Sequence, residues 1–439
     1  MSSPSIPLNR WQVVAGAILI QLSLGAIYAW SVFTPALIAT GWSRLDTQIV
    51  FSVGLASFAL VMVLAGRLLQ HWGPRRLAMI GGLCLGSGYL VAGLSGGHQF
   101  WGVLIGVGLI GGAGIGLGYV VPIAVGMRWF PDHKGLITGL AVAGFGFGAM
   151  AWVKLAGEWG QLLSTYGLAT TFMLYGTVFA ALVLIGSYWM QMPPPGWKPA
   201  GFVAPPQLAG KGGEDFNASE MLRTPQFYLI FLTFAVSAGA GLMAIGLMKL
   251  YPMEALQAQG YSLAEASAIA GTAMAVFFSL ANGIGRIVWG LLSDRLGRKH
   301  SVVLMAASQG LILLSFSTLA GHEYLLYLGA TLIGFNFGGN FALFPALTAD
   351  EFGNKTVGQN YPYIFLSYGL GGIVFPILGG ILGDLGNFPL AFTLCGIACL
   401  LGALASALLF PPHRDESHQP FSVHGFLHHA HVFDHETGK

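Results

Sequence analysis

Apolar stretches long enough to cross a lipid bilayer as helices recur along nearly the whole of this 439-residue chain. A bilayer core of about 30 Å needs about 20 helical residues, so one such stretch is enough for one crossing. Hydrophobic residues make up 55% of the sequence and charged residues 8%, compared with about 25% charged residues in an ordinary soluble domain. The stretches are continuous rather than alternating, which argues against membrane β-strands. The sequence therefore predicts an all-α integral membrane protein in a lipid bilayer.

The apolar stretches fall into two equal groups. In chain order, we expect spans at 11–39, 47–70, 77–95, 100–126, 136–156 and 168–190, and then at 224–250, 265–292, 301–320, 324–349, 360–384 and 389–410. The break between the groups begins with three prolines and carries several charges, as a solvated linker does. The predicted divisions are an N-terminal six-helix bundle at 1–190, a cytoplasmic linker at 191–223, a C-terminal six-helix bundle at 224–410 and a flexible cytoplasmic tail at 411–439.

Lysine and arginine positions predict the orientation of these spans. Cytoplasmic loops of membrane proteins are enriched in both residues. Placing both termini in the cytoplasm puts most of the 19 lysines and arginines on that side. The first span follows Arg10, is too long for the apolar core of a cleaved signal peptide, and has no typical cleavage site. We therefore expect both termini to be cytoplasmic.

Two similar loops occupy the same place in each half, between the second and third spans of that half. Gly66-Arg-Leu-Leu-Gln-His-Trp-Gly73-Pro-Arg-Arg in the first half matches Gly290-Leu-Leu-Ser-Asp-Arg-Leu-Gly297-Arg-Lys in the second. A repeated six-helix unit is typical of secondary transporters, whose halves rock around a substrate site near the bilayer midplane. The repeat therefore favours a transporter.

The second of these loops has the residues of a cytoplasmic gate. Gly290 allows two helices to approach closely, while Asp294 is suited either to a neighbouring helix N-terminus or to pairing with Arg298. Such contacts would have to break when the cavity opens inward. The alternative is that these charges only anchor the helices at the membrane interface. The predicted gate residues are Gly290, Asp294, Arg295, Gly297 and Arg298.

Arg286 is the only charged residue in the stretch from Phe277 to Gly290. An ionised residue at a membrane helix centre costs about 2.5 to 3.5 kcal/mol, so it faces protein or a water-filled cavity. Arginine does not lose its proton in proteins, and the acids within the spans lie at their ends. A mobile carboxylate is a natural counter-charge, because a guanidinium offers it two parallel N–H donors. Asn282, four residues earlier, lies on the same helical face. The alternative is that Arg286 reaches the cytoplasmic boundary or binds backbone carbonyls.

The loop of the second half resembles the cytoplasmic loop motif of the major facilitator superfamily, with Gln70 in place of the acid in the first half. Three further segments resemble the oxalate/formate antiporter family: Tyr28-Ala-Trp-Ser-Val-Phe33, Arg128-Trp-Phe-Pro-Asp-His-Lys-Gly135 and Ala342-Leu-Phe-Pro-Ala-Leu-Thr-Ala-Asp350. The isolated arginine of the eighth span is shared with that family and with the proton-linked monocarboxylate transporters. The resemblance implies a carrier in the bacterial cytoplasmic (inner) membrane. Monocarboxylate transporters have an aspartate where this chain has Asn282, which leaves their proton-coupling mechanism in question here.

Aromatic residues of several spans complete the site that this resemblance implies. Positions that box the substrate in the oxalate/formate antiporter correspond to Tyr28, Tyr119, Phe337 and Phe365. Each of them is equally well explained as a packing residue. The antiporter has a second cation, a lysine, where this chain has Tyr368. Two cations suit a dicarboxylate, whereas Arg286 opposite a neutral tyrosine suits a monocarboxylate, because a second buried carboxylate would lack a partner.

The sequence thus predicts a secondary active transporter of small monocarboxylates of the lactate or pyruvate type, working by alternating access and coupled to protons. The alternatives are an oxalate/formate-type antiporter of organic anions and a carboxylate sensor that does not transport. No phosphate-binding loop is present, so gradients rather than ATP would drive the transport. We expect no cofactor, no metal, no enzymatic activity, no nucleic-acid surface and a monomeric transport unit.

Overall fold

The computed structural model describes residues 9–42, 44–157, 159–199, 215–248, 250–410 and 412. Within these ranges the regular structure is entirely helical. Twelve helices or helical runs are long and apolar enough to cross a membrane, from Arg10–Trp30 to Phe388–Ala407. The predicted all-α fold with twelve spans is confirmed. The predicted tail at 411–439 and part of the predicted linker, 200–214, lie outside the described residues, apart from Pro412.

Helical segments of the first half precede residue 190. They are α1 (Arg10–Leu24), the 3₁₀ segment η1 (Gly25–Val32), α2 (Thr34–Ala39), α3 (Arg44–Trp72), α4 (Pro74–Leu94), α5 (Phe100–Val103), the π-helical η2 (Leu104–Gly111), α6 (Gly112–Trp129), α7 (Lys134–Ala156) and α8 (Leu162–Ser187). Those of the second half follow the linker. They are α9 (Ala218–Met221), α10 (Pro225–Leu247), α11 (Leu250–Ala258), α12 (Leu263–Thr272), the π-helical η3 (Ala273–Phe278), α13 (Ser279–Leu296), α14 (Arg298–Leu319), α15 (Glu323–Phe352), α16 (Val357–Asp384) and α17 (Phe388–Ala407).

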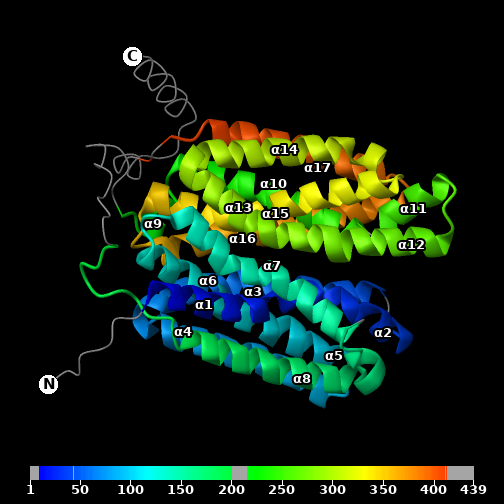
Figure 1. Ribbon diagram of the computed structural model, residues 1–439, viewed down its shortest axis with the longest axis horizontal. Helices are drawn as coiled ribbons and strands as arrows, with labels where there is room; N and C mark the ends of the chain where they lie inside the picture. Colours follow the sequence, from blue (N-terminus) through cyan, green and yellow to red (C-terminus); the bar gives the residue numbers. More distant parts are fainter. Residues whose placement is uncertain are drawn as a thin grey trace.

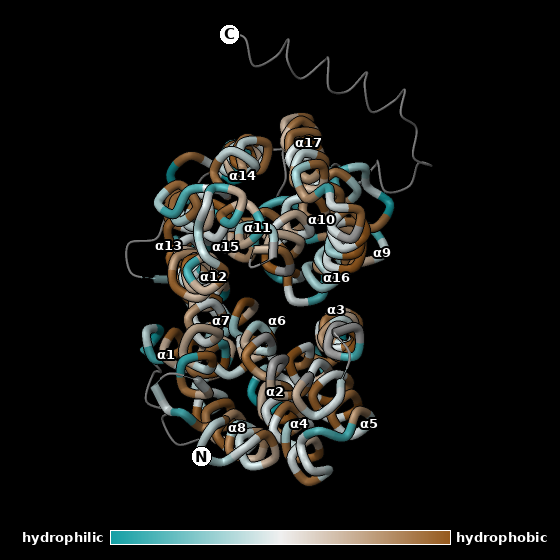
Figure 2. The backbone as a smooth tube through the Cα atoms, turned by 90° about the vertical axis from the view of Figure 1, so that its right-hand side faces the viewer, coloured by the Kyte–Doolittle hydropathy of each residue, from teal (hydrophilic) through white to brown (hydrophobic). Residues whose placement is uncertain are grey.

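The two halves form two bundles that lie side by side with their long helices roughly parallel (Figure 1). Seen along the helices, α1 to α8 gather in one cluster and α9 to α17 in the other (Figure 2). Helices α3 and α7 of the first bundle face α16 and α13 of the second. We call the end of the bundles that carries α9 and residues 191–199 the linker end.

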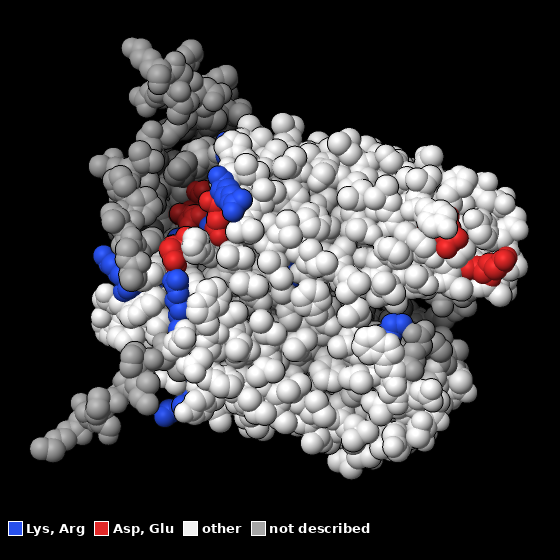
Figure 3. Space-filling model, viewed as in Figure 1, with Lys and Arg blue, Asp and Glu red and all other residues white. Residues whose placement is uncertain are grey.

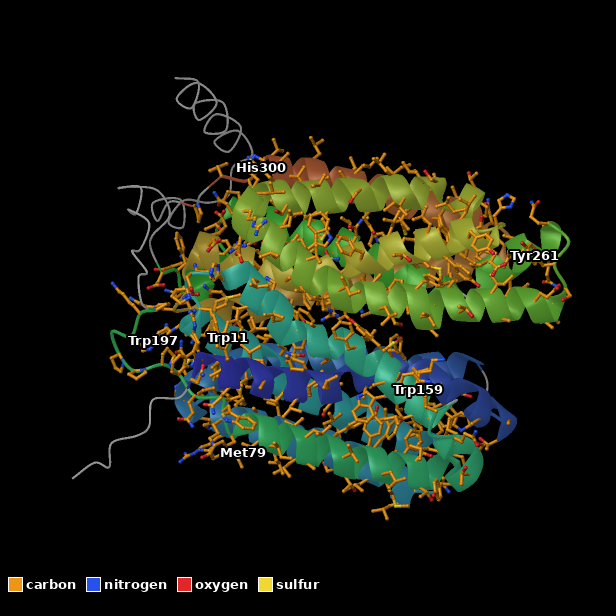
Figure 4. All side chains as sticks on the ribbon, in the orientation of Figure 1. Trp11, Met79, Trp159, Trp197, Tyr261 and His300 are labelled. Carbon is orange, nitrogen blue, oxygen red and sulfur yellow. The ribbon has the colours of Figure 1, made fainter. Side chains whose placement is uncertain are left out.

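Charged and aromatic side chains mark the two ends of the bundles. On the face shown in Figure 3, lysines and arginines gather at the linker end, while the middle is almost free of charge. Trp11 and Trp197 lie at the linker end, and Trp159 and Tyr261 lie at the opposite end (Figure 4). Tryptophan and tyrosine are enriched at both membrane–water interfaces, so this arrangement fits a bilayer around the middle of the helices.

The first apolar stretch is not one helix, which corrects the expectation of a single span over 11–39. Helix α1 gives way at Gly25 to the 3₁₀ segment η1, and α2 follows as a separate helix. Gly25 packs so closely on α7 that a Cβ atom there would overlap the Phe145 backbone. This contact requires glycine, and a 3₁₀ stretch inside a long helix often marks a functional hinge. The η1 segment contains Tyr28 and places its ring at the interface of the two bundles.

The repeated loops of the two halves share one backbone conformation. Gly73 begins α4 with φ 75° and ψ 159°, and Gly297 begins α14 with φ 85° and ψ 153°. Residues with a Cβ rarely adopt such a positive φ, so glycine is required at both positions. The repeat seen in the sequence is therefore a repeat in structure.

Glycine pairs bring the two bundles together at the linker end. Gly290 of α13 packs on Gly135 of α7, and a Cβ on either residue would overlap the backbone of the other. On the other side of the interface, a Cβ on Gly66 of α3 would lie 2.5 Å from the carbonyl oxygen of Gly358 of α16. Small residues allow such close approach of helices within a membrane. Between α7 and α12, at the opposite end, the surface is hollowed (Figure 3).

Candidate functional site

Arg286 lies fully buried at the interface of the two bundles, with 0% of its surface exposed. Its Nε donates a hydrogen bond to Oδ1 of Asn282, 3.2 Å away on the same helix. Its Nη1 donates to the carbonyl oxygen of Val142, 3.1 Å away on α7 of the other bundle. One guanidinium group thus contacts both halves. It does not reach the protein surface, and one of its donors binds a backbone carbonyl.

The remaining nitrogen of Arg286, Nη2, has no hydrogen-bond partner among the described residues. None of the ion pairs in the described part of the chain includes this arginine. Its charge instead faces the rings of Phe341 and Phe145, with ring centroids 4.2 and 5.4 Å from Cζ. Cation–π contacts offset part of the desolvation of the charge but leave a buried N–H donor unused.

Two tyrosine hydroxyls lie close to this guanidinium. The Oη atoms of Tyr119 on α6 and Tyr361 on α16 are both buried and have no partner that meets hydrogen-bond geometry. Tyr119 and Arg286 both pack against the Phe145 ring, and the Tyr119 hydroxyl lies within interaction range of Arg286 and of the Tyr361 hydroxyl. Gln21 fixes the backbone beside Tyr119, because its Nε2 donates to the Tyr119 carbonyl oxygen at 3.2 Å. Three polar groups from α6, α13 and α16 therefore form one buried cluster.

Tyr28 and Tyr368 form a second contact between the bundles. Their hydroxyl oxygens are 2.5 Å apart and share one hydrogen bond. Tyr368 lies two helical turns beyond Tyr361 on α16, further from the linker end, since α16 begins there. The pair therefore lies on the side of the buried cluster that is away from the linker end.

Aromatic rings fill the rest of the site. Phe365 stacks on Tyr368 with centroids 4.7 Å apart and lies 5.4 Å from Tyr119. Phe337 lies 6.2 Å from Tyr28 and 5.2 Å from Phe341. The structure thus brings together all the residues predicted from the sequence to bind substrate, namely Arg286, Asn282, Tyr119, Tyr28, Phe337, Phe365 and Tyr368. Their role in binding stays a prediction.

Sequence reasoning missed several residues of this site. Phe341 and Tyr361 lie one helical turn from the predicted Phe337 and Phe365, so helical spacing could have indicated them. Phe145 stands in a glycine-rich run that indicates only close helix packing. The contact of Arg286 with the Val142 carbonyl of α7 could not be predicted, because a pattern of side chains does not indicate which backbone carbonyls are contacted.

Asp294 holds the two bundles together at the linker end. Its Oδ1 and Oδ2 accept hydrogen bonds from the backbone N–H groups of Gly135 and Leu136, at 2.9 and 2.8 Å, in the first turn of α7. A carboxylate at a helix N-terminus satisfies unpaired N–H groups and complements the helix dipole. Arg298 also pairs with it at 2.7 Å, so Asp294 makes both contacts considered from the sequence.

Asp350 extends this network. Arg298 and Lys134, from different halves, contact its two oxygens at 2.9 and 2.8 Å. Among the predicted gate residues, Gly290 supplies the close approach and Gly297 the turn, whereas Arg295 is exposed and takes part in none of the ion pairs of the described residues. We call the contacts of Asp294, Arg298, Lys134 and Asp350 the latch.

Among the described residues of the first half, no ion pair occupies the corresponding place. Gln70 stands where the second half has Asp294, and it lines a cavity of about 230 Å³ beside the start of α16. Arg128 and Lys355 line the same cavity. The linker end is therefore closed by a charged network on one side, and on the other by the Gly66–Gly358 contact and a hydrogen bond from Arg67 Nε to the Tyr363 hydroxyl at 3.1 Å.

Comparisons with known proteins agree with this architecture. Residues 17–278 and 251–429 match the family model of the Major Facilitator Superfamily. The oxalate:formate antiporter of Oxalobacter formigenes is 25% identical over 406 residues, covering 92% of this chain and 92% of that protein. Monocarboxylate transporter 11 of Homo sapiens is 26% identical over 408 residues, covering 90% of this chain and 81% of that protein. The crystal structure of the Escherichia coli fucose:proton symporter FucP has a TM-score of 0.66 at 15% identity, covering 90% of this chain and 98% of that one.

The solved structure supports the fold alone, and the sequence matches support the ancestry. Together they confirm the resemblance predicted from the repeated loop and from the aromatic motifs, and they assign the chain to transporters rather than enzymes. With its twelve membrane helices, its two bundles and a family match over most of its length, the chain belongs to the Major Facilitator Superfamily.

Proposed function

We propose that this protein is a secondary active transporter of small monocarboxylates, of the lactate or pyruvate type. The observation that carries the proposal is the fully buried guanidinium of Arg286, which has one unused donor and no acidic partner. A carboxylate bound there would neutralise a charge that the described part of the chain leaves without an ion pair. The names of two relatives, an oxalate:formate antiporter and a monocarboxylate transporter, point to the same class of anion.

A single carboxylate fits the charges of this site better than two. Arg286 is the one cation of the cluster described above, and the surrounding groups are phenols and aromatic rings. A second buried carboxylate would have no cation to compensate it, which costs several kcal/mol. The aromatic rings provide an apolar surface for the short carbon chain of the substrate.

Substrate binding would control the rocking of the bundles through this charge. With the site empty, burial of the guanidinium between the bundles costs free energy that Asn282, the Val142 carbonyl and the two aromatic rings offset only in part. A bound anion removes that penalty, so the bundles can close and reopen on the other side. A differential affinity of a few kcal/mol is enough to shift such a two-state equilibrium. The latch would have to open in the inward-facing state.

The charge distribution supports one orientation in the membrane. Lysines and arginines gather at the linker end, and such residues favour the cytoplasmic side (Figure 3). We therefore propose that the linker and both termini are cytoplasmic. The bacterial inner membrane as the site of action and one chain as the transport unit are further parts of the proposal.

Proton coupling is part of the proposal and has a direct test. In proteoliposomes, labelled lactate is expected to accumulate faster under an inward proton gradient than without one, and a protonophore is expected to remove the difference. Symport with one proton makes uptake of a monovalent anion electroneutral. Uptake that requires preloading with another carboxylate and ignores the proton gradient would replace symport by anion exchange of the oxalate/formate type.

Tyr368→Lys is expected to widen the substrate range to dicarboxylates. The added cation would face the site opposite Arg286 and could pair with a second carboxylate, a contact worth a factor of about ten. Oxalate should then inhibit labelled lactate exchange at about tenfold lower concentration than in the wild type.

Tyr368→Phe is the matched control, because it removes the hydrogen bond to Tyr28 without adding charge. If oxalate inhibits the lysine and phenylalanine variants equally, the neutral residue at this position does not set the preference for one carboxylate.

A further inference from the structure

We propose that Tyr361 binds the substrate carboxylate together with Tyr119 and Arg286, so that one small anion joins the two bundles. This inference rests on the function proposed above and adds a binding residue to it. Tyr119 belongs to α6 of the first bundle, whereas Tyr361 and Arg286 belong to α16 and α13 of the second. An anion held by all three would be bonded to both halves at once.

The chemistry of the three groups is that of an anion site. The guanidinium offers Nη2–H, and the two phenols offer their O–H groups, so each of the three unpartnered groups can donate. A carboxylate has two oxygens with about four lone-pair positions, enough to accept from all three donors. Buried donors without partners are rare in native structures and are costly, so a set of three in one place indicates a ligand.

Tyr361 is buried, unlike a tyrosine at the protein surface, whose hydroxyl bonds to water. Its side chain is 0% exposed, and Tyr119 is 1% exposed. The ring of Tyr361 packs against Phe365 with centroids 5.8 Å apart, and Phe365 in turn contacts Tyr119. The rings are thus held by packing, while the hydroxyls lie near each other and near Arg286 without a contact of full hydrogen-bond geometry among the described residues.

The two tyrosines of α16 have different partners. Tyr361 and Tyr368 are seven residues apart, which places them on one face of the helix about two turns from each other. Tyr368 already bonds to Tyr28 across the interface, while Tyr361 has no such bond. In this arrangement Tyr368 closes the site from one side, and Tyr361 completes the binding of the anion from the linker side.

The test compares Tyr361→Phe, Tyr119→Phe and the double variant with the wild type. Each single variant is expected to bind lactate about tenfold more weakly, because a hydrogen bond to a charged group is lost. The double variant is expected to bind lactate more weakly than either single variant, and its departure from a loss of about a hundredfold measures the coupling of two contacts that share one anion. The measurements are thermal stabilisation of the detergent-solubilised protein by lactate and the half-saturating concentration in counterflow.

Tyr89→Phe is the matched control, because Tyr89 is buried inside the first bundle among Phe172 and Phe179. It should bind lactate as the wild type does. Unfolding temperatures without lactate should be similar for all variants, since phenylalanine keeps the ring packing.

Two outcomes separate the role of Tyr361 from the proposed function. If Tyr361→Phe binds lactate within twofold of the wild type while Arg286→Ala binds none, the assignment of Tyr361 is overturned and the carboxylate site of Arg286 stands. If the wild type neither binds nor exchanges any monocarboxylate, the proposed function fails and this inference fails with it.

Discussion

Arg286→Ala is expected to abolish exchange of labelled lactate, with a loss of at least about a hundredfold. The substitution removes the cation of the site, so a bound carboxylate would be buried without a partner, a situation that costs about 3 to 5 kcal/mol. It also removes the bond to Val142 that spans the bundles. The measurement is counterflow into vesicles preloaded with unlabelled lactate.

Two variants control this experiment. Arg76→Ala removes an equal charge from an exposed position at the start of α4 and should leave exchange unchanged. Arg286→Lys keeps the charge but loses the planar, bidentate geometry that Asn282 orients, so intermediate activity is expected. Exchange in Arg286→Ala at the wild-type rate would show that the buried charge is structural.

Gly290→Val is expected to hold the linker end open and to stop transport. A Cβ at this position overlaps the Gly135 backbone, so the added side chain must push α13 away from α7. The two bonds from Asp294 to the first turn of α7 would then be strained or lost. A carrier that cannot close on one side cannot complete a cycle.

Cysteine labelling reports this opening directly. Ser293 is 1% exposed beside the latch, so a cysteine placed there should react slowly in the closed state. In the Gly290→Val background, its labelling by a maleimide from the linker side should accelerate at least about tenfold. Gly380→Val is the control, because a Cβ at Gly380 meets nothing within 4 Å. Unchanged labelling and transport in Gly290→Val would contradict the role given to this contact.

Much of the fold could be predicted because the membrane restricts the options. A span without water must satisfy its own backbone, so about 20 apolar residues predict a helix almost regardless of neighbours. Within the span, the same rule isolates Arg286, since a charge in hydrocarbon needs an explanation. The contact of Asp294 could be predicted for a similar reason, because its place in a repeated loop indicates a partner at a helix end.

The contacts between different helices were harder to predict from the sequence. Helical spacing places Asn282 near Arg286 because both share one helix, whereas Val142, Phe145 and Tyr361 reach the arginine from other helices. Nothing in a one-dimensional pattern fixes which faces of separate helices meet. The break at Gly25 was missed for the same reason, since it depends on the approach of α7.

The unequal closure of the linker end has a consequence for the path by which the substrate leaves. Along α7 and α13, carboxylates and cations join the two bundles, while along α3 and α16 Gln70 stands in place of the acid beside a cavity, and the bundles are joined by the hydrogen bond from Arg67 to the Tyr363 hydroxyl. Among the described residues, the α3–α16 contact has fewer ion pairs and should separate first. The bundles would then rotate about the contact between α7 and α13. The substrate would then be released toward the groove between α3 and α16, past Tyr361, rather than straight down the middle of the molecule.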